Sequence, residues 1–92
     1  MKIVQILQSR KFDKQYKKLP DDIKKAYQKQ LGFLLSDSQH PSLNMKKLQG
    51  EDNIWECRIN ISYRFTFQFE NNIIYLRSIG THSILKFPLI LS

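Results

Sequence analysis

The hydrophobic period of this chain changes once, near its middle, and this change constrains the fold more than any other feature. In residues 9–36 apolar side chains recur at intervals near four, and the longest such stripe consists of Ile23, Tyr27, Leu31, Leu34 and Leu35. In residues 54–69 apolar side chains occupy every second position. The first period is typical of an amphipathic helix, and the second of a strand with one buried face. The sequence therefore predicts an α+β domain with helices before the sheet.

Residues 9–36 are predicted to form a helical hairpin. Ser9 is suited to cap a first helix, which the Leu19-Pro20 step ends. Pro20 followed by two aspartates is typical of the start of a second helix. Because the face opposite the apolar stripe is rich in lysine, we expect the hairpin to bury one side and to expose a basic one.

Strands are predicted on both sides of this hairpin. Residues 2–7 favour an N-terminal strand, and the segments 54–59, 63–69 and 73–79 form three more, with a further short pairing strand near 46–49 left open. Strands joined by short turns give an antiparallel sheet. We therefore expect a β-α-α-β-β-β order, with the N-terminal strand and the hairpin packed on one face of a small curved sheet and an open basic cleft on the other.

Strand alternation assigns side chains to the two faces of the sheet. One set packs against the hairpin: Trp55, Cys57, Ile59, Tyr63, Phe65, Phe67 and Phe69. The other set points away from it: Glu56, Arg58, Arg64, Thr66 and Gln68. Two arginines on adjacent strands then share the uncovered face, a good receptacle for a phosphodiester. An ordinary solvated sheet face is the alternative.

Length and composition limit the remaining possibilities. Ninety-two residues, 41% of them apolar, are consistent with a single globular domain over residues 1–92 and with no bilayer-spanning segment. The single cysteine, Cys57, excludes an internal disulfide and is expected to be a packed core thiol, which favours a reducing, cytoplasmic setting. The two histidines, His40 and His82, lack a metal-binding spacing, so we expect no metal and no cofactor.

The charge balance indicates what kind of molecule the chain binds. Fifteen lysines and arginines against eight acids give a net charge of +7. Such an excess favours a polyanionic partner, because each phosphate that the protein neutralises releases counterions. A basic but inert surface is the alternative.

Four segments, residues 40–50, 54–59, 63–65 and 79–83, together resemble the RelE/ParE superfamily of bacterial toxin–antitoxin toxins. The resemblance extends over essentially the whole chain and implies a helical hairpin against a small antiparallel sheet. Within that superfamily the RelE, YoeB and YafQ branches cut mRNA, generally on the ribosome, whereas the ParE branch poisons DNA gyrase. Both kinds are held inactive by an antitoxin that wraps the toxin.

The resemblance also implies a catalytic set. Lys46 falls where YoeB-like members have a glutamate base and YafQ-like members a histidine, and Arg58 falls where a basic cleft residue is usual. Arg64 matches the arginine that meets the scissile phosphate, and His82 matches the catalytic histidine of the YafQ-like branch. Further RNA-binding positions are expected at Lys47, Arg77 and Lys86.

The alternation of side chains along the last strand decides whether His82 or Arg77 faces the predicted cleft. Leu76 and His82 are both even-numbered, so a buried Leu76 turns His82 inward as well, unless a bulge near Gly80 changes the phase. Without such a bulge, Arg77 takes the cleft face.

The sequence is therefore interpreted as a metal-independent mRNA endoribonuclease of a type II toxin–antitoxin system. Arg58 and Arg64 would hold the phosphate, His82 would donate a proton, and Lys46 would act as base or as a phosphate-positioning cation. The expected partners are an acidic antitoxin, mRNA and the ribosome, with operator DNA bound only through the antitoxin and no membrane. The alternatives are a ParE-like gyrase inhibitor and an inactive member that binds only its antitoxin and operator DNA.

Overall fold

The computed structural model describes residues 2–48, 50 and 53–85, and at His82 and Leu85 it describes the backbone alone. These described residues form five strands, two α-helices and two short 3-10 helices. In order these are β1 (Gln5–Gln8), α1 (Arg10–Lys17), α2 (Asp21–Ser36), η1 (Pro41–Leu43), β2 (Lys46–Lys47), β3 (Ile54–Arg58), β4 (Tyr63–Glu70), β5 (Ile73–Thr81) and η2 (His82–Leu85). The predicted element order is confirmed, and the short strand near residues 46–49 is present as β2.

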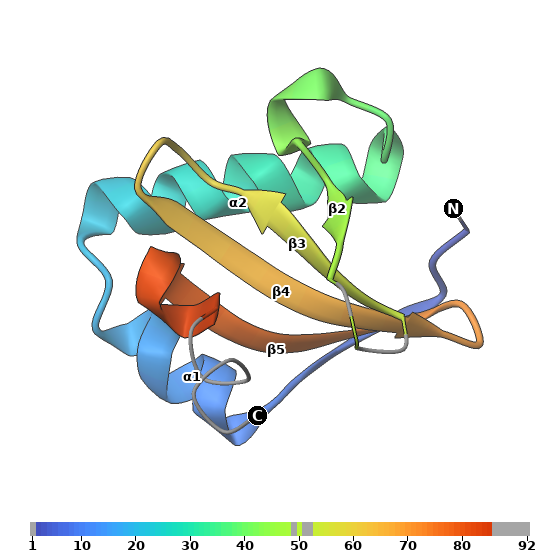
Figure 1. The fold of residues 1–92 in the computed structure, drawn as a ribbon, viewed down its shortest axis with the longest axis horizontal. Helices are drawn as coiled ribbons and strands as arrows, with labels where there is room; N and C mark the ends of the chain where they lie inside the picture. The colour runs from blue at the N-terminus through green and yellow to red at the C-terminus, as the bar shows by residue number, and fades with distance from the viewer. Residues whose placement is uncertain (1, 49, 51–52, 86–92) are drawn as a thin grey trace.

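The strands form one mixed sheet in the order β1-β5-β4-β3-β2, and α2 lies across one face of it (Figure 1). Neighbouring strands from β2 to β5 are antiparallel. β1 pairs with β5 in parallel. Parallel neighbours need a long connection, and here the connection contains both α-helices and the other three strands. The predicted α+β class is confirmed, with one parallel edge strand added to the antiparallel sheet.

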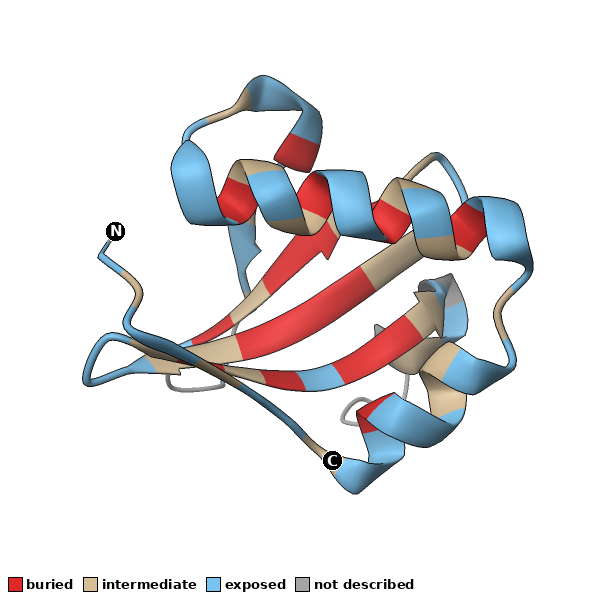
Figure 2. Ribbon diagram, turned by 180° about the vertical axis from the view of Figure 1, so that it is seen from behind, coloured by how far each residue is buried: buried red, intermediate tan, exposed pale blue. Residues whose placement is uncertain are grey.

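The core lies between α2 and the sheet. Figure 2 shows the buried residues of α2 turned toward the strands. The ring of Tyr27 in α2 meets Phe65 of β4 edge to face, with 5.2 Å between centroids. The predicted inward set is confirmed: Cys57, Ile59, Phe65 and Phe67 are buried, and Trp55, Tyr63 and Phe69 pack against them partly buried. These aromatic side chains are core residues, not an exposed base-stacking surface.

One bulge changes the phase of β5. Thr66 pairs with Ser78 and Phe67 pairs with Leu76, so Arg77 is an extra residue in β5. Leu76 and Ile79 are both buried as a result, although one number is even and the other odd. A bulge therefore does change which residues of the last strand face the core, as considered from the sequence, but it lies at Arg77 and not near Gly80.

Beyond the end of β1, side chains of the first helical segment complete the edge of β5. The Ser9 hydroxyl donates a hydrogen bond to the carbonyl of Arg77 (2.9 Å), and the Gln15 side chain accepts one from the amide of Ile79 (2.9 Å). The Ser9 hydroxyl also accepts from the amide of Phe12, so the predicted helix cap is confirmed. The backbone of the bulged segment is thus paired where no strand is available.

A buried glutamine holds the end of β3 in place. Gln30, 5% exposed on the inner face of α2, donates hydrogen bonds to the carbonyls of Ser42 (3.0 Å) and Arg58 (2.9 Å). A buried amide of this kind is tolerated because its polar atoms find partners. Gln30 therefore connects α2, η1 and the strand residue that carries the Arg58 side chain.

Candidate nucleic-acid site

Two arginines face each other on the side of the sheet that α2 leaves uncovered. Arg58 at the end of β3 is the register partner of Arg64 near the start of β4. Both are half-buried, and each alternates with core residues such as Cys57 and Phe65. Directly opposed side chains in an antiparallel pair lie close together, so two guanidinium groups share one patch. The predicted pairing of Arg58 and Arg64 is thus present.

A carboxylate accompanies this arginine pair. Glu56 Oε1 accepts a hydrogen bond from Arg64 Nη1 at 2.9 Å, and the two side chains are 9% and 16% exposed, respectively. Sequence reasoning placed Glu56 on the uncovered face but assigned it no role. The pair requires the observed register, in which an acid two positions before Arg58 lies diagonally across from Arg64, and the alternation of side chains in the sequence does not specify that register.

Both arginines keep unused hydrogen-bonding capacity. The Nε atoms of Arg58 and Arg64 are buried and have no hydrogen-bond partner among the described residues. Burying a charged donor without an acceptor is unfavourable, so each of these groups calls for a partner such as a water molecule or an anion. A phosphate oxygen is an acceptor of the right charge and geometry for a guanidinium.

The polar face continues across the sheet from the arginines. Thr66 and Ser78 are buried, and their hydroxyl oxygens lie 2.5 Å apart. Glu56 is the register partner of Thr66 and of Lys46. A row of polar side chains therefore runs from β2 to β5 beside the arginine pair.

The two lysines of β2 lie on different faces of the sheet. Lys46 pairs with Glu56, whereas Lys47 pairs with Trp55, whose side chain packs toward the core. Both lysines are exposed. The structure thus brings Lys46 to the polar row and places Lys47 on the opposite side.

The last strand approaches the arginines through Gly80, the register partner of Arg64. A Cβ added at Gly80 would lie 3.0 Å from Ile84 Cγ2, a tight contact that the Ile84 side chain in η2 would have to relieve by shifting. Since Gly80 shares the face of Arg64, η2 folds over this side of the sheet, opposite α2 (Figure 1). His82 begins η2, but its side chain lies outside the described part of the chain, as does the whole of Lys86. Arg77 is exposed at the bulge.

Comparison with known proteins shows which solved structures share this fold. No protein-family profile and no curated protein matches the chain. Solved structures do match: the DinJ–YafQ toxin–antitoxin complex of E. coli (14% identity, TM-score 0.76, covering 92% of this chain and 98% of the other) and the RelB–RelE complex of Methanococcus jannaschii (22%, 0.71, 86% and 93%). A metal-bound toxin from Helicobacter pylori matches as well (25%, 0.73, 90% and 99%).

The chain has the fold of the RelE and YafQ toxins. The resemblance to RelE-type toxins that the sequence showed is confirmed for the fold, and the matches cover 86–92% of this chain. No group of three or more His, Cys, Asp or Glu side chains that could hold a metal ion lies within the described residues of this RelE-fold chain. None of its described helices is long and apolar enough to cross a membrane.

The single cysteine of this RelE-fold chain is not suited to nucleophilic chemistry. Cys57 is fully buried on the core face of β3. Burial, and secondarily the nearby Glu56 carboxylate, raises the pKa of the Cys57 thiol to about 12. The thiol is therefore protonated at neutral pH, as expected for a packed core residue.

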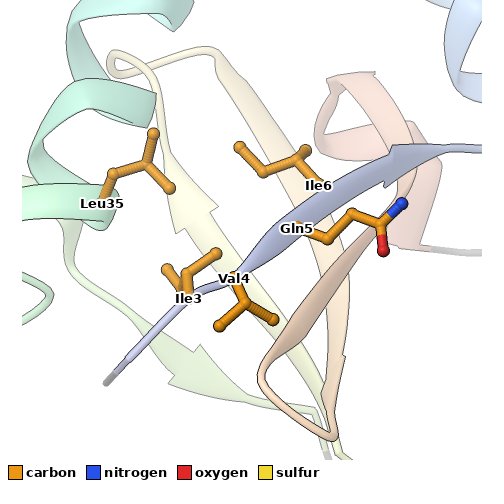
Figure 3. Close-up of a pocket in the computed structure, with 5 residues that line it drawn as sticks. All are labelled: Ile3, Val4, Gln5, Ile6 and Leu35. Carbon is orange, nitrogen blue, oxygen red and sulfur yellow. The ribbon is translucent and has the colours of Figure 1, made fainter.

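An apolar groove lies elsewhere in the RelE fold, between β1 and the end of α2 (Figure 3). Its lining residues are Ile3, Val4, Gln5, Ile6 and Leu35. Val4 and Leu35 are exposed large hydrophobic residues. The groove contains no charged side chain, so it is chemically distinct from the arginine patch.

Proposed function

We propose that this chain is the toxin of a type II toxin–antitoxin system and that it cleaves mRNA without a metal ion. The observation that carries this proposal is the pair of half-buried arginines, Arg58 and Arg64, whose Nε groups have no acceptor within the described residues. Adjacent guanidinium groups with unused donors are suited to hold one phosphodiester and to stabilise the extra charge of its transition state.

RNA cleavage requires three actions that this face could combine. The 2′-hydroxyl must lose its proton, the pentacoordinate phosphate must be stabilised, and the 5′-oxygen must gain a proton, which leaves a 2′,3′-cyclic phosphate. Arg58 and Arg64 serve the second action. His82 is the proton donor, because the reference pKa of histidine, about 6.5, lies near working pH. Lys46 is the base or a cation that positions the phosphate.

Further cations extend the proposed RNA contact beyond the reacting phosphate. Arg77 at the bulge, Lys47 on β2 and Lys86 after η2 supply charge to neighbouring nucleotides. Because Lys47 lies on the face of Trp55, its contact would be with RNA that passes around the edge at β2.

The proposed partners follow from the comparisons and the charge. Several of the similar structures are toxin–antitoxin complexes, which supports an antitoxin partner for this chain. The net charge of +7 favours an acidic antitoxin. The proposal includes the ribosome as the place of cleavage, the cytoplasm as the setting, and operator DNA as a ligand of the antitoxin alone.

Mapping of mRNA 5′ ends after induction of the chain in growing cells tests this proposal. We expect new 5′ ends within coding regions, and cuts in phase with codons if the ribosome presents the mRNA. Unchanged mRNA together with a DNA-damage response would contradict the proposal in favour of a ParE-like gyrase inhibitor. Unchanged mRNA with normal growth would contradict it in favour of an inactive member.

A further inference from the structure

We propose that Glu56 is the residue that reads the ribose of the substrate. This inference rests on the proposed function: when Arg64 holds a phosphate, the Glu56 carboxylate accepts a hydrogen bond from the adjacent 2′-hydroxyl. The site then selects RNA over DNA through a single acceptor.

A negatively charged side chain, Glu56, is unexpected in a site proposed to bind a polyanion. Glu56 would repel any phosphate that Arg58 and Arg64 attract, so it lowers the affinity for phosphate in general. The repulsion is offset when the ligand brings a hydrogen-bond donor to the carboxylate. Ribonucleotides bring such a donor next to the 3′-phosphate, and deoxyribonucleotides do not.

The contacts of Glu56 leave room for this donor. Oε1 accepts one hydrogen bond, from Arg64 Nη1 at 2.9 Å, and Oε2 accepts none from any other described residue. An ionised carboxylate has about four acceptor positions. Because Glu56 and a phosphate on Arg64 would share one guanidinium, the phosphate and the free carboxylate oxygen lie within a nucleotide's reach.

Neighbouring hydroxyl groups of the protein do not occupy Glu56. Thr66 is its register partner on β4, but the Thr66 hydroxyl is paired with Ser78, at 2.5 Å between oxygens. Lys46, its partner on β2, is exposed. Glu56 Oε2 therefore keeps its acceptor capacity, and because the Glu56 side chain is only 9% exposed, a small donor such as a hydroxyl group held beside Arg64 is the kind of group that would reach it.

A simpler role for Glu56 makes a different prediction. Arg58 and Arg64 are directly opposed like charges, and a nearby carboxylate reduces their repulsion. If Glu56 only did this, its replacement would change the binding of ribonucleotides and deoxyribonucleotides by the same factor. The ratio of the two affinities therefore separates the roles.

The test compares two uncleavable probes that differ in one hydroxyl: adenosine 3′-monophosphate and 2′-deoxyadenosine 3′-monophosphate. Each is titrated by calorimetry into the wild-type protein, Glu56→Gln, and the matched control Glu70→Gln, which changes an exposed acid at the end of β4. We expect the wild type and the control to prefer the ribonucleotide by about tenfold, the value of one charge-assisted hydrogen bond. Glu56→Gln keeps a carbonyl acceptor but loses the charge, so it should show a several-fold smaller preference and bind the deoxyribonucleotide more tightly than the wild type does.

Equal wild-type affinities for the two probes would overturn the inference, and so would a preference that is unchanged in Glu56→Gln. If messenger RNA is cut in cells while the probes bind equally, the proposed function stands and this inference alone fails. Binding of neither probe overturns the inference and removes support for the phosphate site. Should Glu56→Gln melt below the working temperature, Glu56→Asp retains the carboxylate, and we expect a reduced preference of the same direction.

Discussion

Arg64 connects every part of the polar face at the scale of single residues. It opposes Arg58, pairs with Glu56 and has Gly80 as its neighbour on β5. A change at Arg64 therefore alters this polar face, whereas the aromatic core on the other face is left unchanged.

We predict that Arg64→Ala abolishes growth inhibition while the protein stays folded and still binds its antitoxin. Loss of one charge-assisted contact to a transition-state phosphate costs about 2.7–4 kcal/mol, or roughly 10²–10³ in rate, by comparison with oxyanion-hole donors. Growth after induction and circular dichroism measure the two effects. Arg10→Ala is the matched control, because Arg10 is exposed at the start of α1. Full toxicity of Arg64→Ala would refute the phosphate-holding role.

A second residue-scale prediction concerns the Cys57 thiol and pH. Its pKa is raised from the ordinary 9.0 to about 12 in the folded protein, chiefly by burial. Because the folded state favours the protonated thiol, the resulting stability is fully present below about pH 9 and is lost as pH rises toward 12. Urea unfolding between pH 8 and 11 should show a steeper loss of stability for the wild type than for Cys57→Ala. Equal slopes would contradict this contribution.

At the scale of elements, hydrogen bonds from side chains join segments that strands do not connect. Ser9 and Gln15 complete the edge of β5, and Gln30 joins α2 to η1 and to the end of β3. The helical layer therefore does more than cover the sheet, because it also holds the backbone beside Arg58 and Arg77.

We predict that Gln30→Leu lowers the free energy of unfolding by about 1–3 kcal/mol. The substitution removes the donor to the carbonyls of Ser42 and Arg58 and so breaks two partly buried hydrogen bonds. Urea denaturation measures the loss. Gln28→Leu is the control: this position is exposed on the same helix and loses one solvent-exposed hydrogen bond, to the Tyr16 hydroxyl (3.1 Å), so stability should change by no more than about 0.5 kcal/mol. A Gln30→Leu protein as stable as this control would show that the two hydrogen bonds contribute nothing.

At the scale of the whole molecule, the net charge of +7 predicts the chemistry of the partner. Affinity purification from a lysate of the native cells, followed by mass spectrometry, should recover a small acidic protein encoded beside this chain. Electrostatic attraction speeds such an encounter, so the association rate should fall as salt rises. Recovery of ribosomes or gyrase without an acidic neighbour would leave the toxin–antitoxin interpretation without its second component.

The sequence by itself determined the two faces of the sheet. A strand has a side-chain period of two, so a run that buries Cys57 and Phe65 must turn Arg58 and Arg64 the other way. The helical stripe that contains Tyr27 likewise had to be covered by the same aromatic residues. These conclusions depend on local geometry alone, and for that reason they agree with the structure.

Other features were decided only by the tertiary structure. The parallel pairing of β1, the position of the bulge at Arg77 and the closure of η2 over Gly80 depend on which segments meet across long stretches of chain. The Glu56–Arg64 ion pair depends on the register between β3 and β4, which alternation does not specify. Local patterns assign a residue to a face, whereas its partners on that face are set by contacts between strands.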